Sequence, residues 1–156
     1  MGISMAFPRE DAGPFRALRK FRKSTDKAIA GTVERLNTRL TRIYLGTATD
    51  DDFCAIATYL VYGFVLAKNF RDIDQESFVI AVQELAEAKR LLIKGEVAHD
   101  LLDAVSERFE VAKAMVFDLT IGEQEHLQAF VRKNGLCILN KMQKRKPDLY
   151  KVRKGE

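Results

Sequence analysis

Two copies of the motif Glu-x-x-His are the residues of this sequence whose types and spacing most resemble a reaction centre. They are Glu96-Val97-Ala98-His99 and Glu123-Gln124-Glu125-His126. In four-helix di-iron proteins, two such motifs and further glutamates hold the metals inside the bundle. Helical projection argues against that use here, because His99 and His126 each lie about 100 degrees from the apolar side of their helix. Both motifs also fall in first helical turns, where the helix dipole favours Glu. We therefore expect no metal site and no cofactor.

Other signatures of catalysis are missing from the sequence. It has no Gly-rich phosphate loop, no G-x-S-x-G and no CxxC pair. The two cysteines, Cys54 and Cys137, stand in apolar runs. This context predicts small buried hydrophobic residues in a reducing, cytoplasmic compartment, not nucleophiles or a disulfide framework. We expect a protein that is not an enzyme and has no small-molecule substrate.

The charges of the chain are sorted by region. The formal net charge of +4 divides into +6 over residues 1–45, −9 over 46–128 and +7 over 129–156. Such a basic, acidic, basic pattern concerns association with partners more than chemistry. The charge distribution therefore makes charged helix faces the candidate binding surfaces.

Helical periodicity predicts an all-α fold, a single-domain bundle over residues 1–156 with short basic tails at 1–13 and 147–156. Prolines occur only at positions 8, 14 and 147, so the interval between the last two lacks the strongest helix breaker. Helices are expected over 14–45, from Thr49 onward, from Asp72 or Asp74 to Lys94-Gly95, over 96–119, and from Thr120 onward. These make five helices, or six if Asn134-Gly135 breaks the last one.

The helix that follows Thr49 is apolar nearly all round, which predicts that it is the central helix of the bundle. Its longest uncharged stretch, 53–67, is too short to cross a bilayer, so no transmembrane segment is expected. A second apolar face on this helix must meet either the later helices or another subunit. The candidate apolar interface consists of Val61, Tyr62, Val65 and Leu66.

Two basic regions are candidates for interaction. Five cations on the first predicted helix project within about a 100-degree arc, opposite Phe15 and Leu18: Arg16, Arg19, Lys20, Lys23 and Lys27. A second set forms a basic C-terminal tail, in which only Tyr150 could stack on a base: Lys141, Lys144, Arg145, Lys146, Lys151, Arg153 and Lys154. Both regions suit phosphates, anionic lipid or an acidic protein surface, and both also suit a solvated helix face.

The fourth predicted helix carries the opposite charge. Five carboxylates project within about an 80-degree arc away from its apolar stripe, and we call them the acidic ridge: Glu96, Asp100, Asp103, Glu107 and Glu110. Such a ridge can simply keep a helix hydrated, or it can receive a basic helix from the same chain, a neighbouring copy or a protein partner.

The leading hypothesis from the sequence is therefore a non-enzymatic helical interaction protein, such as an adaptor, a regulator or a small subunit of a larger assembly. Its partner would be another protein or a second copy of the chain. The rival hypothesis is an accessory protein that binds the nucleic-acid phosphate backbone through the basic helix face and the basic tail. We find no family whose motifs can be matched residue by residue.

Overall fold

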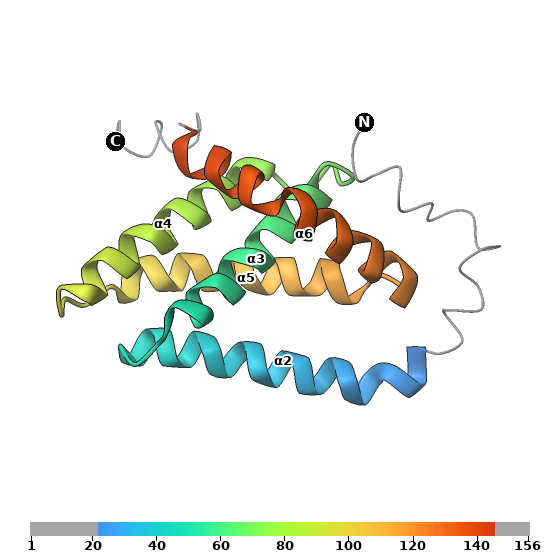
Figure 1. Ribbon diagram of the computed structural model, residues 1–156, viewed down its shortest axis with the longest axis horizontal. Coiled ribbons are helices and arrows are strands. Elements are labelled where there is room, and N and C mark those ends of the chain that lie inside the picture. The colour runs from blue at the N-terminus through green and yellow to red at the C-terminus, as the bar shows by residue number, and fades with distance from the viewer. Residues whose placement is uncertain (1–21, 146–156) are drawn as a thin grey trace.

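A computed structural model describes the backbone of residues 22–145 and the side chains of residues 31–145. Over this range the protein is an all-α bundle without strands, as predicted (Figure 1). The helices are α2 (Arg22–Leu45), α3 (Asp50–Ala67), α4 (Gln75–Ile93), α5 (His99–Phe117) and α6 (Ile121–Lys144). The predicted helix start at Pro14 and the predicted tails, 1–13 and 147–156, lie outside the described residues.

The predicted caps and stops account for most helix boundaries. Asp74 is the residue that caps α4, because its side chain accepts a hydrogen bond from the backbone N–H of Glu76. Gly46 and Gly95 follow the ends of α2 and α4 with φ of 77° and 80°, a region that glycine enters without strain. Thr120 and Glu123 form the predicted capping box at the start of α6.

The predicted start of α5 at Glu96 is wrong. The backbone N–H of Glu96 donates to the carbonyl of Leu91 at 2.9 Å and so closes the C-terminal turn of α4. Because this group completes the preceding helix, two further residues, Val97 and Ala98, precede the start of α5 at His99. Glu96 therefore lies in the connection between two helices and does not belong to the helical part of the acidic ridge.

Helix α6 continues through Asn134-Gly135 without a break, so the alternative of a sixth helix at this place does not occur. Gly135 keeps helical geometry, since the only glycines with positive φ among the described residues are Gly46 and Gly95. The side chain of Asn134 turns back and donates to the carbonyl of Phe130 at 3.0 Å.

Helix α3 is the central helix, as predicted. It packs against α2, α4, α5 and α6, whereas α6 packs mainly against α3 and α4. Ile56, Leu60 and Leu66 of α3 have no exposed surface. Gly63 permits the close approach of α4, because a Cβ atom built there would lie 2.3 Å from the Phe78 ring. Within the described range, no helix has both the length and the apolar character required to span a bilayer.

Candidate interaction surfaces

The described cations of α2 are partly used inside the bundle. Arg42 makes a two-pronged contact with Asp52 of α3, with Nη2–Oδ1 and Nε–Oδ2 distances of 2.7 and 3.0 Å. Arg39 Nη1 reaches the same carboxylate at 3.0 Å. The hydrogen bond from Arg42 holds the pKa of Asp52 well below its usual range, although burial alone would raise it. Asp52 is therefore a buried ion-pair partner that ties α3 to α2.

The acidic ridge is exposed in the structure, but two of its members also hold neighbouring side chains. Asp103 accepts a hydrogen bond from the hydroxyl of Tyr44 at 2.6 Å, and burial together with this contact raises the pKa of Tyr44 well above its usual range. Glu110 lies 2.8 Å from Lys113 Nζ. Asp100 and Glu107 are exposed and have no hydrogen bond or ion pair to any other described residue. They are the ridge carboxylates most available to a partner.

Lys113 joins the ridge to α2. Its side chain is only 6% exposed, and its Nζ atom donates to Asn37 Oδ1 at 2.6 Å. The same ammonium lies 4.5 Å from the centre of the Phe109 ring, a cation–π distance. Within the described residues, the ion pair to the acidic ridge therefore comes from Lys113 of α5 itself, and α2 contributes the hydrogen bond from Tyr44.

The basic sets named from the sequence are only partly within the described residues. Arg16, Arg19, Lys20 and Lys146, and the three tail cations after residue 150, Lys151, Arg153 and Lys154, lie outside that range. So do the side chains of Lys23 and Lys27, although their backbone belongs to α2. The remaining tail residues, Lys141, Lys144 and Arg145, are exposed near the end of α6, and Arg145 pairs with Glu76 of α4.

The candidate apolar interface on α3 is part of the core. Val61, Tyr62, Val65 and Leu66 are between 0% and 9% exposed and belong to the main hydrophobic cluster. The sequence left open whether this face meets the later helices or another subunit. It meets the later helices, because α4, α5 and α6 all pack on α3. These four side chains are not available to a second subunit on the surface of the folded chain.

The expectation that both cysteines are buried is wrong. Cys54 and Cys137 are free thiols at exposed positions. Cys54 faces outward between the buried Asp52 and Ile56 of α3, and Cys137 lies beside Leu136, which is 74% exposed. An apolar run in sequence does not fix burial, because in a helix each residue points about 100 degrees from its neighbour.

The Glu-x-x-His residues do not form a common site. Glu123 is fully buried, and its Oε1 atom accepts a hydrogen bond from the N–H of Thr120 at 2.8 Å in the capping box. His126 is exposed on α6, and His99 packs beside the Tyr44 ring at 5.6 Å. Among residues 31–145, no three His, Cys, Asp or Glu side chains are grouped to hold a metal ion.

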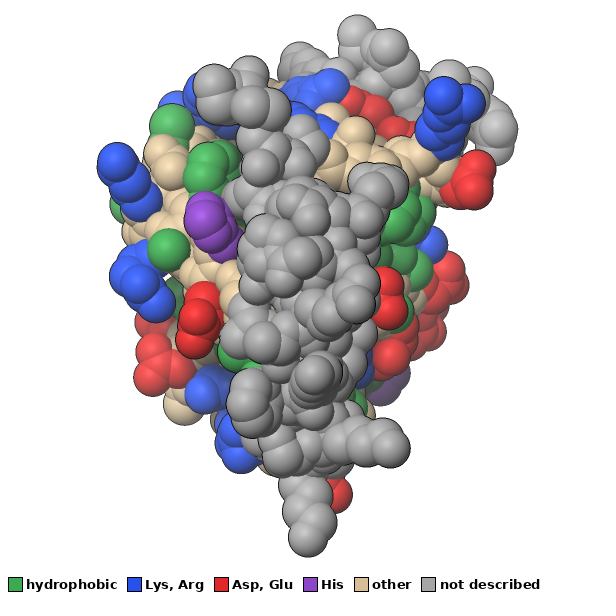
Figure 2. All heavy atoms as spheres, turned by 90° about the vertical axis from the view of Figure 1, so that its right-hand side faces the viewer, with side chains coloured by type: hydrophobic (Ala, Val, Ile, Leu, Met, Phe, Trp, Pro, Cys, Tyr) green, Lys and Arg blue, Asp and Glu red, His purple; other side chains and the backbone are tan. Residues whose placement is uncertain are grey.

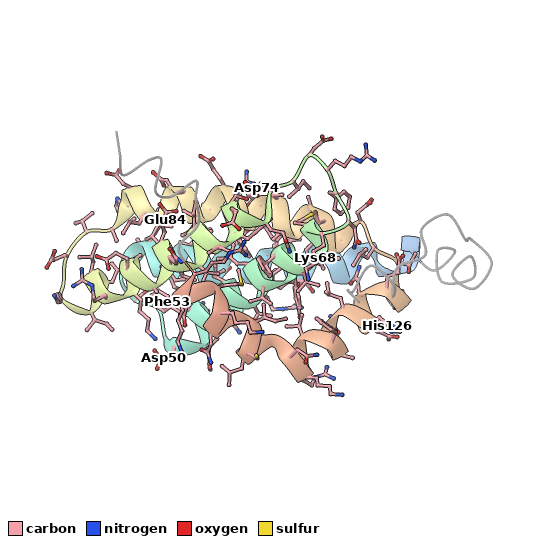
Figure 3. The ribbon with its side chains drawn as sticks, turned by 90° about the horizontal axis from the view of Figure 1, so that it is seen from above. Asp50, Phe53, Lys68, Asp74, Glu84 and His126 are labelled. Carbon is pink, nitrogen blue, oxygen red and sulfur yellow. The ribbon has the colours of Figure 1, made fainter. Side chains whose placement is uncertain are left out.

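Two adjoining depressions on α3 and α4, of which one reaches the end of α2 and the other reaches α6, share the side chains of Asp50, Phe53 and Lys89. Figure 3 labels Asp50 and Phe53. Lys89 Nζ lies 3.1 Å from Asp50 Oδ1 and 5.4 Å from the centre of the Phe53 ring. Their volumes of about 240 and 200 Å³ are below those usual for small-molecule sites, and their lining is mostly apolar. This groove has no arrangement of polar groups that would identify a ligand.

The α2–α3 and α4–α5 turns lie at the same end of the bundle (Figure 1), and exposed apolar side chains occur beside both turns. Leu45, Ile93 and Val97 are 70%, 76% and 75% exposed, which is unusual for large apolar residues. Val97 and Asp100 line one shallow depression, so the apolar end adjoins the start of the acidic ridge. This patch is not among the surfaces predicted from the sequence, although apolar residues beside the Gly46 and Gly95 turns are a usable signal.

The outer face of α6 was also missed. From Ala129 to Arg145 the chain has five cations and no carboxylate, and Arg132, Lys133, Lys141 and Lys144 are exposed. We call these four residues, together with the exposed Leu136, the α6 basic face. Only Lys141 and Lys144 of this face are among the cations predicted from the sequence to interact, as part of the basic C-terminal tail.

At the end of the bundle at which α2 and α6 begin, Figure 2 shows both Lys or Arg and Asp or Glu side chains among the described residues. Among the described residues, the exposed charged side chains of α5 are mainly carboxylates and those of α6 are mainly cations. Comparison with known proteins adds no assignment, because no family model, no curated protein and no solved structure matches this chain.

Proposed function

We propose that this protein is a non-enzymatic interaction protein that binds another protein molecule through its charged helix faces, as an adaptor, a regulator or a small subunit of an assembly. The observation that carries the proposal is the outward position of Asp100 and Glu107 on α5, together with the exposed Val97 beside Asp100. Unpaired carboxylates next to an apolar side chain suit a partner surface that has both cations and apolar groups.

Affinity capture from the native cell with the full chain as bait tests the proposal. Nuclease treatment removes partners that are held only through nucleic acid. Wild-type bait should retain a protein partner after nuclease, and the double variant Asp100→Lys/Glu107→Lys should lose it, because like charges then meet across the interface. The matched control Glu34→Lys/Asp72→Lys makes the same change of charge at exposed positions off the ridge and should behave as wild type. Equal retention by the ridge variant and the control would refute the proposal.

Nucleic-acid binding is the second candidate, and the α6 basic face supports it because its four cations, in a segment without a carboxylate, suit a phosphate backbone. Titration of a duplex and of a single strand at several salt concentrations tests this candidate. Binding through phosphates should weaken with salt, with a log–log slope of roughly 0.7 to 0.9 per phosphate neutralised. No salt-sensitive binding at low ionic strength would eliminate it.

A further inference from the structure

The α6 basic face and the acidic ridge have the dimensions of complementary surfaces. On a helical projection Lys133, Leu136 and Lys144 fall within about an 80-degree arc. Lys133 and Lys144 are about 16 Å apart along α6, and Asp100 and Glu110 are about 15 Å apart along α5. Each surface also has one strongly exposed apolar side chain, Leu136 at 74% and Val97 at 75%.

These two faces cannot meet within one folded chain. Figure 3 shows α5 and α6 along opposite edges of the bundle, with α3 and α4 between them. Both helices bury their apolar side against this middle layer, as Phe109 of α5 and Leu127 of α6 show with no exposed surface. Their charged sides therefore face away from each other, and only a second molecule can bring them together.

We propose that the acidic ridge of one copy of this chain binds the α6 basic face of a second copy. This inference rests on the proposed function and names the partner. The interface is heterologous, since it joins different surfaces of the two copies. An assembly of any length therefore has an unused acidic ridge at one end and an unused α6 basic face at the other. Association then continues into short chains of copies instead of stopping at a symmetric dimer. Opposite charges hold the contact, so salt weakens it.

Complementary charge reversal in the full-length protein tests this pairing by analytical ultracentrifugation. One variant, Asp100→Lys/Glu107→Lys, makes the ridge basic, and the other, Lys133→Glu/Lys144→Glu, makes the α6 face acidic. All four residues are exposed and make no ion pair with another described residue, so circular dichroism should show an unchanged helical content. The control Glu34→Lys/Asp72→Lys changes charge off both faces.

Wild-type protein and the control should sediment as a concentration-dependent series of species at low salt. This series should collapse to monomer near 1 M salt, where the screening length falls to about 3 Å. Each reversed variant alone should associate at least about tenfold more weakly, because like charges then face each other. An equimolar mixture of the two variants should recover association, since every contact between unlike variants is again between opposite charges.

Three results would overturn the proposal. They are a monomeric wild type at concentrations up to about 1 mM at low salt, an association that neither reversal weakens, and a mixture that fails to recover. A fourth result would also overturn it and assign the α6 basic face to phosphate binding. In that case the wild type stays monomeric and binds a single-stranded oligonucleotide, and Lys133→Glu/Lys144→Glu loses this binding. The proposed function is tested independently of this pairing. It requires only that a protein partner retained after nuclease treatment is lost from the bait when the ridge is reversed.

Discussion

Helices α3 and α6 use their surfaces in opposite ways. Helix α3 contacts all four other described helices, and even its carboxylate Asp52 is buried and held by two arginines. Helix α6 packs mainly against α3 and α4 and leaves a side with exposed cations, Leu136 and Cys137 turned outward. The sequence predicted the central position of α3 but left open whether its second apolar face meets the later helices or another subunit, and it predicted no interaction surface in the middle of α6.

The difference shows that the type of a residue does not by itself indicate whether it is available to a partner. The large apolar side chains of the most apolar helix are covered by its four neighbours, whereas Leu136, which is 74% exposed, lies on a basic helix. Asp52 is charged yet structural, whereas Lys133 is charged and contacts no described acid. Variants on the two helices should therefore separate effects on folding from effects on binding.

The largest expected effect is the loss of a core side chain of α3. Leu60→Ala should lower the free energy of unfolding by about 2–5 kcal/mol, because Leu60 has no exposed surface and its truncation leaves a cavity. Urea unfolding followed by circular dichroism measures this change. The matched control on α6 is Leu136→Ala, which should stay within about 0.5 kcal/mol because this side chain is 74% exposed. Similar losses in both variants would mean that the two helices do not differ as described.

Removal of the buried charge of α3 should have the next largest effect. Asp52→Asn should cost about 1.5–3 kcal/mol at neutral pH, because Arg39 and Arg42 lose a charged acceptor. The control Asp51→Asn alters an exposed carboxylate in the same helical turn and should change stability by less than about 1 kcal/mol.

The ion pairs of Asp52 with Arg39 and Arg42 predict a pH dependence of stability. The pKa of Asp52 is lower in the folded chain than in the unfolded one, so its contribution is fully present above the unfolded value of about 3.9. It is lost as the pH falls toward the folded value, because the carboxylate then takes up a proton and its ion pairs break. Unfolding measured between pH 7 and about pH 2.5 should show the difference between wild type and Asp52→Asn shrinking as the pH falls. A constant difference would exclude Asp52 as its source.

A smaller loss is expected where α3 meets α4. In Gly63→Ala the new methyl group would lie 2.3–2.8 Å from three Phe78 ring atoms, so the two helices must separate or the ring must move. Such overpacking typically costs about 1–3 kcal/mol. Gly31→Ala is the control in α2, where the nearest atom, Arg35 Nη1, is 3.5 Å away. It should be neutral or stabilising by up to about 1 kcal/mol, because alanine favours helix.

The predictability of the fold follows from the kind of information each feature requires. Helix number, the central position of α3 and the caps at Asp74 and Thr120 depend on local sequence, and the structure confirms them. The predicted start of α5 is wrong because the backbone N–H of Glu96 donates a hydrogen bond to the carbonyl of Leu91. This contact depends on how the preceding helix ends. The exposure of both cysteines and the outward α6 face depend on which neighbours cover each helix side. That is a property of the tertiary arrangement, and no periodicity in one helix specifies it.

The smallest effect on stability is expected on α6, and it is the sharpest test of the comparison. Lys133→Glu/Lys144→Glu should change the free energy of unfolding by no more than about 0.5 kcal/mol, because both ammonium groups are exposed and pair with no described carboxylate. Two new carboxylates in the second half of the helix oppose its dipole, which sets the sign of any small loss. Urea unfolding at low protein concentration measures it without a contribution from association. A loss above about 1.5 kcal/mol would mean that the α6 cations stabilise the fold, as the arginines at Asp52 do, and that this side of α6 is not a free surface.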